Sequence, residues 1–257
     1  MKQTIQVGTK SYTVPQHWFW KQFSNSWEPQ TLRFFEKYII EGTDYLDVGA
    51  WIGPTAMIAT SLGAKKSVII EPNPTAQVVL QEIKEDNNLD SWELHSCCIS
   101  NKKGKEIIGP FESIQSVSSA TNTRGGSGVE VDSTRLHGFS SSGEYSVIKI
   151  DIEGAEIHIT PELEWLGKNK KSAIWLSLHP PFIDKTANWF NPFAEVIFEH
   201  FHVLEANTLQ PLKHGVDTLV DMVWSEEKTP EWGTEWGNFF EIGLLPKKFF
   251  NASGDPK

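Results

Sequence analysis

The sequence predicts an α/β protein built on a doubly wound, mostly parallel seven-stranded sheet. Short apolar strands alternate with helical segments from residue 44 onward, and turns rich in glycine or carboxylates follow several of these strands. Alternation of this kind is typical of parallel βαβ units that carry helices on both faces of the sheet. With 257 residues, 39% of them hydrophobic, the chain is long enough to bury a sizeable core.

Residues 1–42 are expected to form an N-terminal appendage that packs on the main domain. Residues 3–14 alternate around a glycine turn, as a β-hairpin does. Residues 28–40 repeat apolar side chains at helical spacing, and Pro29 suits the first turn of a helix. A hairpin followed by a helix is therefore predicted for this segment.

Residues 43–257 are expected to form the main domain. Its predicted elements, in chain order, are strand 45–48, helix 54–63, strand 67–71, helix 75–88, strand 92–99, strand 146–151, strand 173–178, helix 185–200 and a final strand pair at 201–207 and 218–224. Val78, Val79 and Ile83 are expected on the buried face of helix 75–88. The serine-rich segment 109–128 is a candidate lid or an inert surface insertion, and residues 225–257 are interpreted as a C-terminal tail.

The net charge and the cysteine content limit the classes of binding partner and the cellular compartment to be expected for this chain. The chain holds 23 Lys and Arg against 33 Asp and Glu, which gives a formal net charge of −10 and argues against nucleic acid as a partner. No cluster of basic residues favours an anionic membrane surface, and no apolar run is long enough to span a membrane. The two cysteines are adjacent, which excludes a disulfide framework and a C-x-x-C metal site. We therefore expect a cytoplasmic protein with free thiols.

The most informative turn follows the first strand of the main domain, at Asp47-Val48-Gly49-Ala50-Trp51-Ile52-Gly53. Glycines there allow the backbone to approach a ligand closely. A dinucleotide fingerprint would have glycine in place of Trp51, so the approach of a pyrophosphate is expected to be blocked. Asp47 adds negative charge, which favours a cationic nucleoside ligand without phosphates. A tight structural turn in which Asp47 caps the helix is the alternative.

Glu71 ends the next strand, and Pro72-Asn73-Pro74 fixes the turn behind it. A carboxylate at this place can accept hydrogen bonds from both hydroxyls of a ribose. The alternative is that Glu71 caps the helix predicted over 75–88.

Polar side chains also follow the fourth and fifth strands, at Lys149-Ile150-Asp151-Ile152-Glu153-Gly154-Ala155-Glu156 and at His179. Ligands of open α/β sheets bind outside the carboxyl ends of the strands, near the point where the strand order reverses. His179 is a candidate general base or a metal ligand beside Asp151 and Glu153. The alternatives are that the carboxylates stabilise the next helix through its dipole and that Lys149 is a salt-bridge partner.

Three of these motifs resemble the FkbM-type methyltransferases: the turn from Asp47 to Gly53, Ile70-Glu71-Pro72-Asn73-Pro74, and the segment from Ile148 to Glu156. Members of that family are S-adenosylmethionine-dependent enzymes with the class I methyltransferase fold, and the likeness covers roughly residues 44–205. It implies that the first turn, with Gly49, Ala50 and Trp51, wraps the amino-acid end of the cofactor. It also implies that Glu71, beside Pro72 and Asn73, holds the ribose, and that Cys98 lies near the adenine. Trp51 departs from the Asn that is commonest there in the family.

The sequence thus predicts an S-adenosylmethionine-dependent O-methyltransferase that acts on a hydroxyl of a sugar or a glycosylated small molecule. Asp151, Glu153 and His179 are expected to take the hydroxyl proton, directly or through an alkoxide on a divalent metal, and Lys149 to hold them in place. The sugar rests on the family and on aromatic side chains that can stack on sugar rings, namely Trp189, Trp224, Trp232 and Trp236. The alternatives are an NAD-dependent oxidoreductase and a non-catalytic binding module that keeps the fold.

Overall fold

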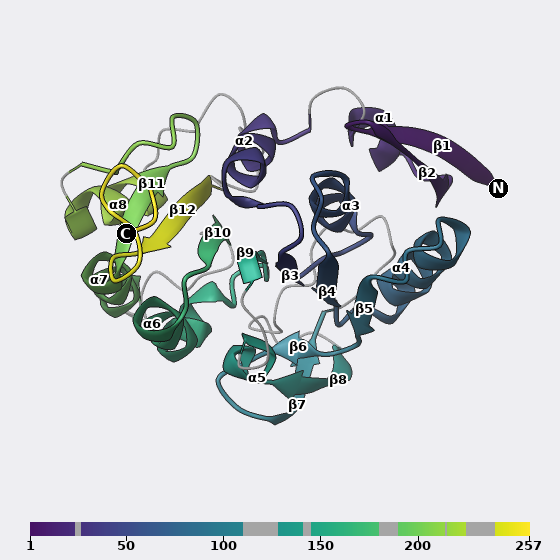
Figure 1. The fold of residues 1–257 in the computed structure, drawn as a ribbon. Coiled ribbons are helices and arrows are strands. Elements are labelled where there is room, and N and C mark those ends of the chain that lie inside the picture. The colour runs from purple at the N-terminus through teal and green to yellow at the C-terminus, as the bar shows by residue number, and fades with distance from the viewer. Residues whose placement is uncertain (24–26, 110–127, 141–144, 180–189, 214, 225–239) are drawn as a thin grey trace.

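The computed structural model describes residues 1–23, 27–109, 128–140, 145–179, 190–213, 215–224 and 240–257 (Figure 1). Most of the candidate lid at 109–128 lies outside these residues, as does the first part of the predicted helix 185–200. The aromatic residues Trp189, Trp232 and Trp236 and the side chain of Trp224 lie outside them as well.

A seven-stranded sheet forms the centre of the molecule (Figure 1). In spatial order its strands are β11 (Phe201–Glu205), β12 (Phe240–Pro246), β10 (Ala173–Leu178), β9 (Tyr145–Ile150), β3 (Asp44–Val48), β4 (Lys66–Ile70) and β5 (Trp92–His95). All neighbours pair in parallel except β12, which runs antiparallel to both β10 and β11. The mostly parallel, doubly wound sheet predicted from the sequence is therefore confirmed.

Two hydrophobic cores, one on each face, hold this sheet between helices. Successive residues of a strand point to opposite faces, so Tyr45 joins the first core and Leu46 the second. The first core lies under α2 (Pro29–Tyr38), α3 (Pro54–Ser61) and α4 (Pro74–Asp86). The second lies under α6 (Thr160–Asn169), α7 (Phe190–His200) and α8 (Gly215–Trp224). Figure 1 shows α2 and α3 on one side of the sheet and α6 on the other.

The N-terminal hairpin and helix are present as predicted. Strands β1 (Lys2–Val7) and β2 (Lys10–Pro15) pair antiparallel, and the short helix α1 (Phe19–Phe23) precedes α2. Val14 and Trp20 are buried in the same core as α3 and α4. The hairpin is also held by polar contacts, because the Asn87 side chain bonds both backbone groups of Thr13.

A small three-stranded sheet lies beside the central one and corrects one predicted strand. It consists of β6 (Cys98–Ile99), β8 (Val129–Thr134) and β7 (Gly104–Ile108), and it is followed by α5 (Leu136–Ser140). The single strand predicted over 92–99 is therefore two strands in different sheets, since β5 ends at His95. The 3₁₀ helix Glu156–Ile159 leads into α6.

The last predicted strand pair is wrong in one member. Residues 218–224 belong to helix α8, and the antiparallel partner of β11 is β12, which lies within the range interpreted as a tail. Val216, Leu219 and Val220 all pack on the second core, which is the i, i+3, i+4 spacing of a helix. A short apolar run is compatible with both the two-residue period of a strand and the 3.6-residue period of a helix. In this protein the segment forms a helix.

One residue of the predicted buried face of α4 is wrong. Val78 is 59% exposed, whereas Ile83 is buried and Val79 packs on the first core as predicted. Ala76 and Leu80 complete the buried stripe with Ile83, at positions i, i+4 and i+7.

The packing of α2 on the sheet depends on a glycine. Gly243 lies in β12, and a Cβ atom there would come within 2.7 Å of Phe34 Cε2 and 3.2 Å of Leu204 Cβ. We expect Gly243→Ala to lower the free energy of unfolding by about 1–3 kcal/mol, because the Phe34 ring has to move. The measurement is urea denaturation.

Gly138→Ala is the matched control for this variant. A Cβ at Gly138 in α5 would meet nothing within 4 Å, so its denaturation midpoint should equal or exceed that of the wild type. Equal midpoints for the two variants would show that Phe34 does not press on the sheet at Gly243.

Candidate active site

The functional side chains singled out in the sequence gather at the carboxyl ends of four parallel strands. Asp47 and Lys149 lie within β3 and β9, and Glu71, Asp151 and His179 directly follow β4, β9 and β10. The strand order reverses between β3 and β9, which is where open α/β sheets bind their ligands. The antiparallel strand β12 begins at the same edge, because its residues Phe240 and Glu241 pair with Leu178 and Ser177 of β10.

Glu71 connects the turns that follow β3 and β4. One oxygen of its carboxylate accepts a hydrogen bond from the Trp51 amide at 2.7 Å, and the other accepts one from the Asn73 amide at 2.8 Å. The residue is 3% exposed. Burial raises the pKa of Glu71, and although the two amide hydrogen bonds lower it, the net value is about 7. Glu71 therefore stabilises the geometry of both turns.

The cap of the following helix is Asn73 rather than Glu71. The Asn73 side chain accepts hydrogen bonds from the amides of Thr75 and Ala76 at the start of α4. The alternative role of Glu71 as the helix cap is therefore wrong, and its ribose contact stays a prediction.

Gly49 allows the first turn to touch the turn after β9. Its φ is +80°, and a Cβ atom there would lie 1.8 Å from the carbonyl oxygen of Asp151. The Asp151 amide in turn donates to the carbonyl of Val48 at 3.0 Å. The glycine was expected to let the backbone approach a ligand. In the structure it lets the turn after β3 approach the backbone of the turn after β9.

Trp51 holds the first turn against the N-terminal appendage. Its φ of +49° is in the left-handed region, and its ring lies 4.8 Å from Phe19 and 5.5 Å from His17 between ring centroids. Among the described residues, Trp51 does not line the pocket beside the turn. The ring thus lies against the appendage, and the expectation that Trp51 blocks a pyrophosphate stays a prediction.

A pocket opens beside the first turn, and Gly49, Pro72 and Cys98 all line it. Its walls are mostly apolar, and the residues that line it are Val48, Gly49, Ile70, Pro72, Cys97, Cys98, Ile99, Ile108, Asp151, Ile152 and Ala155. Burial raises the pKa of the Cys97 thiol to about 11 and that of Cys98 to about 12. Both thiols are therefore protonated at neutral pH and serve as apolar wall.

Lys149 is a buried cation that joins the turns after β3 and β9. Its Nζ donates to the carbonyl of Gly49 at 2.8 Å and lies 3.2 Å from Asp151 Oδ2 and 3.6 Å from Asp47 Oδ1. Burial lowers the pKa of Lys149, but the charges of Asp151 and Asp47 outweigh it and the pKa is raised. These contacts favour a positioning role over a direct part in the chemistry.

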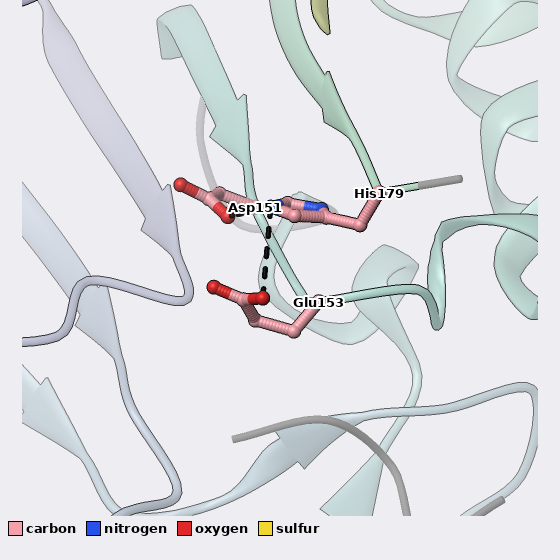
Figure 2. A group of neighbouring side chains, drawn as sticks. All are labelled: Asp151, Glu153 and His179. Atoms are coloured by element: carbon pink, nitrogen blue, oxygen red, sulfur yellow. Dashed lines mark ion pairs between the residues drawn. The ribbon is translucent and has the colours of Figure 1, made fainter. Parts of the chain in front are cut away.

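His179 lies among the carboxylates of Asp151, Glu153 and Glu156, the first two of which are drawn in Figure 2. Its Nε2 lies 3.3 Å from Asp151 Oδ1 and 3.7 Å from Glu153 Oε2, and its Nδ1 lies 2.9 Å from Glu156 Oε1. Burial lowers the pKa of His179, but Glu153 and Glu156 raise it to about 10. Burial raises the pKa of Glu153 to about 8, whereas Lys149 and His179 overcome burial and lower that of Asp151.

Sequence reasoning assigned no role to four polar residues near this cluster. Glu156 orients His179, and Gln30 Nε2 donates to Glu241 Oε2 at 3.2 Å. Burial raises the pKa of Glu241 to about 7, and the pKa of Glu28 is raised by burial and by the charges of Glu241 and Asp151. Glu241 was missed because β12 was missed, while Glu28 precedes α2 and carries no motif.

Backbone strain is concentrated at this edge of the sheet. Five non-glycine residues in the described part of the chain have a left-handed φ, and three of them, Glu28, Trp51 and Glu153, belong to the site or its turns. Such conformations cost about 1–3 kcal/mol each and cluster where a side chain must be held for function.

No protein-family model and no curated protein matches the sequence. Solved structures do match. A methyltransferase FkbM from Methylobacillus flagellatus KT is similar at 16% identity and a TM-score of 0.48, over 88% of this chain and 50% of that one. A putative SAM-dependent methyltransferase from Streptococcus mutans is similar at 12% identity and a TM-score of 0.48, over 95% of this chain and 55% of that one. The chain thus spans about half the length of these two proteins.

An rRNA methylase from Streptococcus thermophilus is similar at 8% identity and a TM-score of 0.46, over 84% of this chain and 93% of that one. The central sheet of this chain, seven-stranded and mostly parallel, is of the fold class expected from the sequence. None of the helices in the described ranges has the length and apolar character to cross a membrane.

The ion pairs of Lys149 with Asp47 and Asp151 are expected to stabilise the fold. We expect Lys149→Met to lower the free energy of unfolding by about 3–5 kcal/mol, because it leaves the buried Asp47 carboxylate without its cation. Adding Asp47→Asn should recover part of this loss, since the amide still accepts the hydrogen bond from the Thr55 hydroxyl. The measurement is urea denaturation of both variants.

Lys168→Met is the control, because Lys168 is exposed and pairs with Glu164 on the surface of α6. Its effect should be within about 1 kcal/mol. An equally small effect of Lys149→Met would contradict the structural role assigned to Lys149.

Proposed function

We propose that this chain is an S-adenosylmethionine-dependent methyltransferase that acts on a hydroxyl group. The main support for this proposal is a pocket that lies between two groups of carboxylates. Glu71 holds the turn on one side of it, and Asp151 lines it on the other side and continues into the His179 cluster. A cationic nucleoside fits between them, because its base needs apolar walls and its charge needs carboxylates.

The parts of S-adenosylmethionine have natural places in this arrangement. The adenine would lie on the wall formed by Cys97, Cys98 and Ile99. The ribose hydroxyls would donate to Glu71, because each oxygen of its carboxylate accepts one amide hydrogen bond and has a second lone pair. The amino-acid end would lie along the turn from Asp47 to Gly53.

Methyl transfer is an in-line displacement in which an acceptor oxygen forms a bond to the methyl carbon as the carbon–sulfur bond breaks. The main demand on the protein is to hold the acceptor at attack distance. The acceptor hydroxyl must also lose its proton, and Asp151 and Glu153 are the carboxylates that would receive it. His179 holds these two carboxylates together, and Lys149 fixes Asp151 to the cofactor turn.

The acceptor we propose is a sugar or a glycosylated small molecule. Support comes from the family resemblance and from Glu28 and Glu241, which add hydrogen-bond acceptors for hydroxyls near Asp151. One structural neighbour is described as an rRNA methylase, so RNA belongs in the acceptor panel. The net charge of −10 speaks against a polyanionic acceptor.

The sheet also bears on the oxidoreductase alternative. The dinucleotide-binding fold has the strand order 3-2-1-4-5-6 with all strands parallel. Here the antiparallel strand β12 is inserted between β10 and β11. NAD binding is therefore not expected.

The cofactor assignment is tested by calorimetric titration with S-adenosylmethionine, S-adenosylhomocysteine and NAD. We expect the first two to bind and NAD not to bind. Glu71→Gln should weaken binding of S-adenosylmethionine by about 10- to 100-fold, because hydrogen bonds to a charged acceptor are worth about 1.5–3 kcal/mol.

Glu82→Gln, the same change at an exposed position of α4, should bind like the wild type. Unchanged affinity in Glu71→Gln, with the fold verified by its denaturation midpoint, would remove Glu71 from the ribose. Failure of the wild type to bind S-adenosylmethionine would overturn the cofactor, and binding without turnover of any acceptor would favour the binding module.

The proton-transfer role is tested by Asp151→Asn. We expect the turnover number to fall by about 10²- to 10⁴-fold, the usual contribution of a positioned proton acceptor. Asp132→Asn is the same change at an exposed residue of β8 and should leave turnover unaltered. Wild-type turnover in Asp151→Asn would remove Asp151 from the chemistry.

A further inference from the structure

Asp151, Glu153 and His179 bring three metal-ligating atoms close to the spacing that a bound ion requires. One oxygen of each carboxylate and Nε2 of the imidazole all lie within 4.8 Å of one another. Nε2 is 3.3 Å from Asp151 Oδ1 and 3.7 Å from Glu153 Oε2. Ligands about 2.1 Å from one ion stand about 3.0–3.4 Å apart at octahedral and tetrahedral angles, so small side-chain shifts complete the fit.

The imidazole is held as metal-binding imidazoles usually are. Its Nδ1 faces Glu156 Oε1 at 2.9 Å, and Glu156 is fully buried and accepts the amides of Ile152 and Gly154. A carboxylate behind the ring keeps a proton on Nδ1, so an ion that displaces the Nε2 proton is bound by the Nε2 lone pair. Figure 2 shows the His179 ring directed toward the carboxylates of Asp151 and Glu153, which lie close to its Nε2.

Among the described residues, no hydrogen bond to the Glu153 carboxylate is found, and His179 is its ion-pair partner. The Glu153 side chain is 13% exposed, and within the described part of the chain its nearest charged partner is His179 Nε2, at 3.7 Å. Lys149 contacts Asp151 and Asp47. A nearly enclosed carboxylate of this kind is costly unless a cation completes its surroundings.

We propose that Asp151, Glu153 and His179 bind a divalent transition-metal cation of the Mn²⁺, Fe²⁺ or Zn²⁺ class. The two carboxylates balance the charge of the ion, and the neutral imidazole keeps its Nδ1 proton for Glu156. One nitrogen and two oxygen ligands favour these ions over Ca²⁺ and Mg²⁺, which prefer oxygen alone.

Three protein ligands leave coordination positions open to water or to a substrate oxygen. Asp151 lines the pocket as well, so an oxygen bound to the ion would lie next to the proposed cofactor. The ion would lower the pKa of that oxygen, which is the activation a hydroxyl acceptor needs. This last consequence rests on the proposed methyltransferase function, whereas ion binding itself does not.

The experiment measures ion binding in the absence of cofactor and acceptor. The full chain is freed of metal with a chelator, the chelator is removed, and MnCl₂ is titrated while the free-ion signal is followed by electron paramagnetic resonance. Mn²⁺ is the probe because the thiols of Cys97 and Cys98 prefer softer ions. We expect one equivalent to bind to the wild type.

His179→Gln and Glu153→Gln should each weaken Mn²⁺ binding by at least about 10-fold, and Glu156→Gln by about 10- to 100-fold through the lost orientation of the ring. His137→Gln is a matched control, because His137 also faces a buried carboxylate, that of Glu162, at 2.9 Å. It should bind Mn²⁺ like the wild type.

Absence of Mn²⁺ binding by the wild type, or undiminished binding in His179→Gln and Glu153→Gln, would overturn the proposal. Glu153→Gln keeps the test decisive if His179→Gln does not fold. Calorimetry with S-adenosylmethionine on the metal-free chain tests the cofactor separately, so failure of the ion site and failure of the proposed function give different results.

Discussion

The site depends on the buried ammonium group of Lys149. It contacts Gly49, Asp47 and Asp151 and so joins the turn after β3 to the turn after β9. The two strands are hydrogen-bonded neighbours, but their turns lead to opposite faces of the sheet, and backbone pairing ends with the strands. Beyond the ends of β3 and β9, Lys149 links the two turns, and Gly49 leaves room there for the Asp151 carbonyl. The turn from Asp47 to Gly53 and the acidic cluster after β9 are therefore fixed to each other by the protein's own contacts.

The excess of carboxylates explains why this edge of the sheet is suited to cations. Lys149 pairs with Asp47 and Asp151, and backbone amides donate to Glu156. Burial raises the pKa values of Glu153, Glu241 and Glu28, although His179, Gln30 and Thr31 contact them. A buried carboxylate with a raised pKa gains most from a cation, because the cation removes the cost of its charge. The same property supports a sulfonium cofactor in the pocket and a metal ion beside it.

Sequence reasoning predicted the elements whose pattern is local. The parallel strands β3, β4, β9 and β10 are continuous apolar runs, and the polar residues that follow them could be expected to meet because parallel strands end at one edge. It failed where the partner is distant in sequence. Nothing near Phe240–Pro246 shows that this segment enters the sheet beside β10, and the apolar run before it, 218–224, satisfied the period of a strand as well as that of α8. Glu241 was not predicted as a site residue because its strand, β12, was not predicted.

The direction of Trp51 was unpredictable for a related reason. The sequence places it in the glycine turn, but its left-handed backbone and the rings of Phe19 and His17 decide where the indole lies. The appendage thus supports the turn from Asp47 to Gly53 through the Trp51 ring, while the Trp51 amide donates to Glu71. Gln30 extends the appendage to the acidic edge of the sheet, where it donates to Glu241 of β12. Segments from the two ends of the sequence, α2 and β12, therefore meet at this edge, and the appendage contributes to the candidate site as well as to the core.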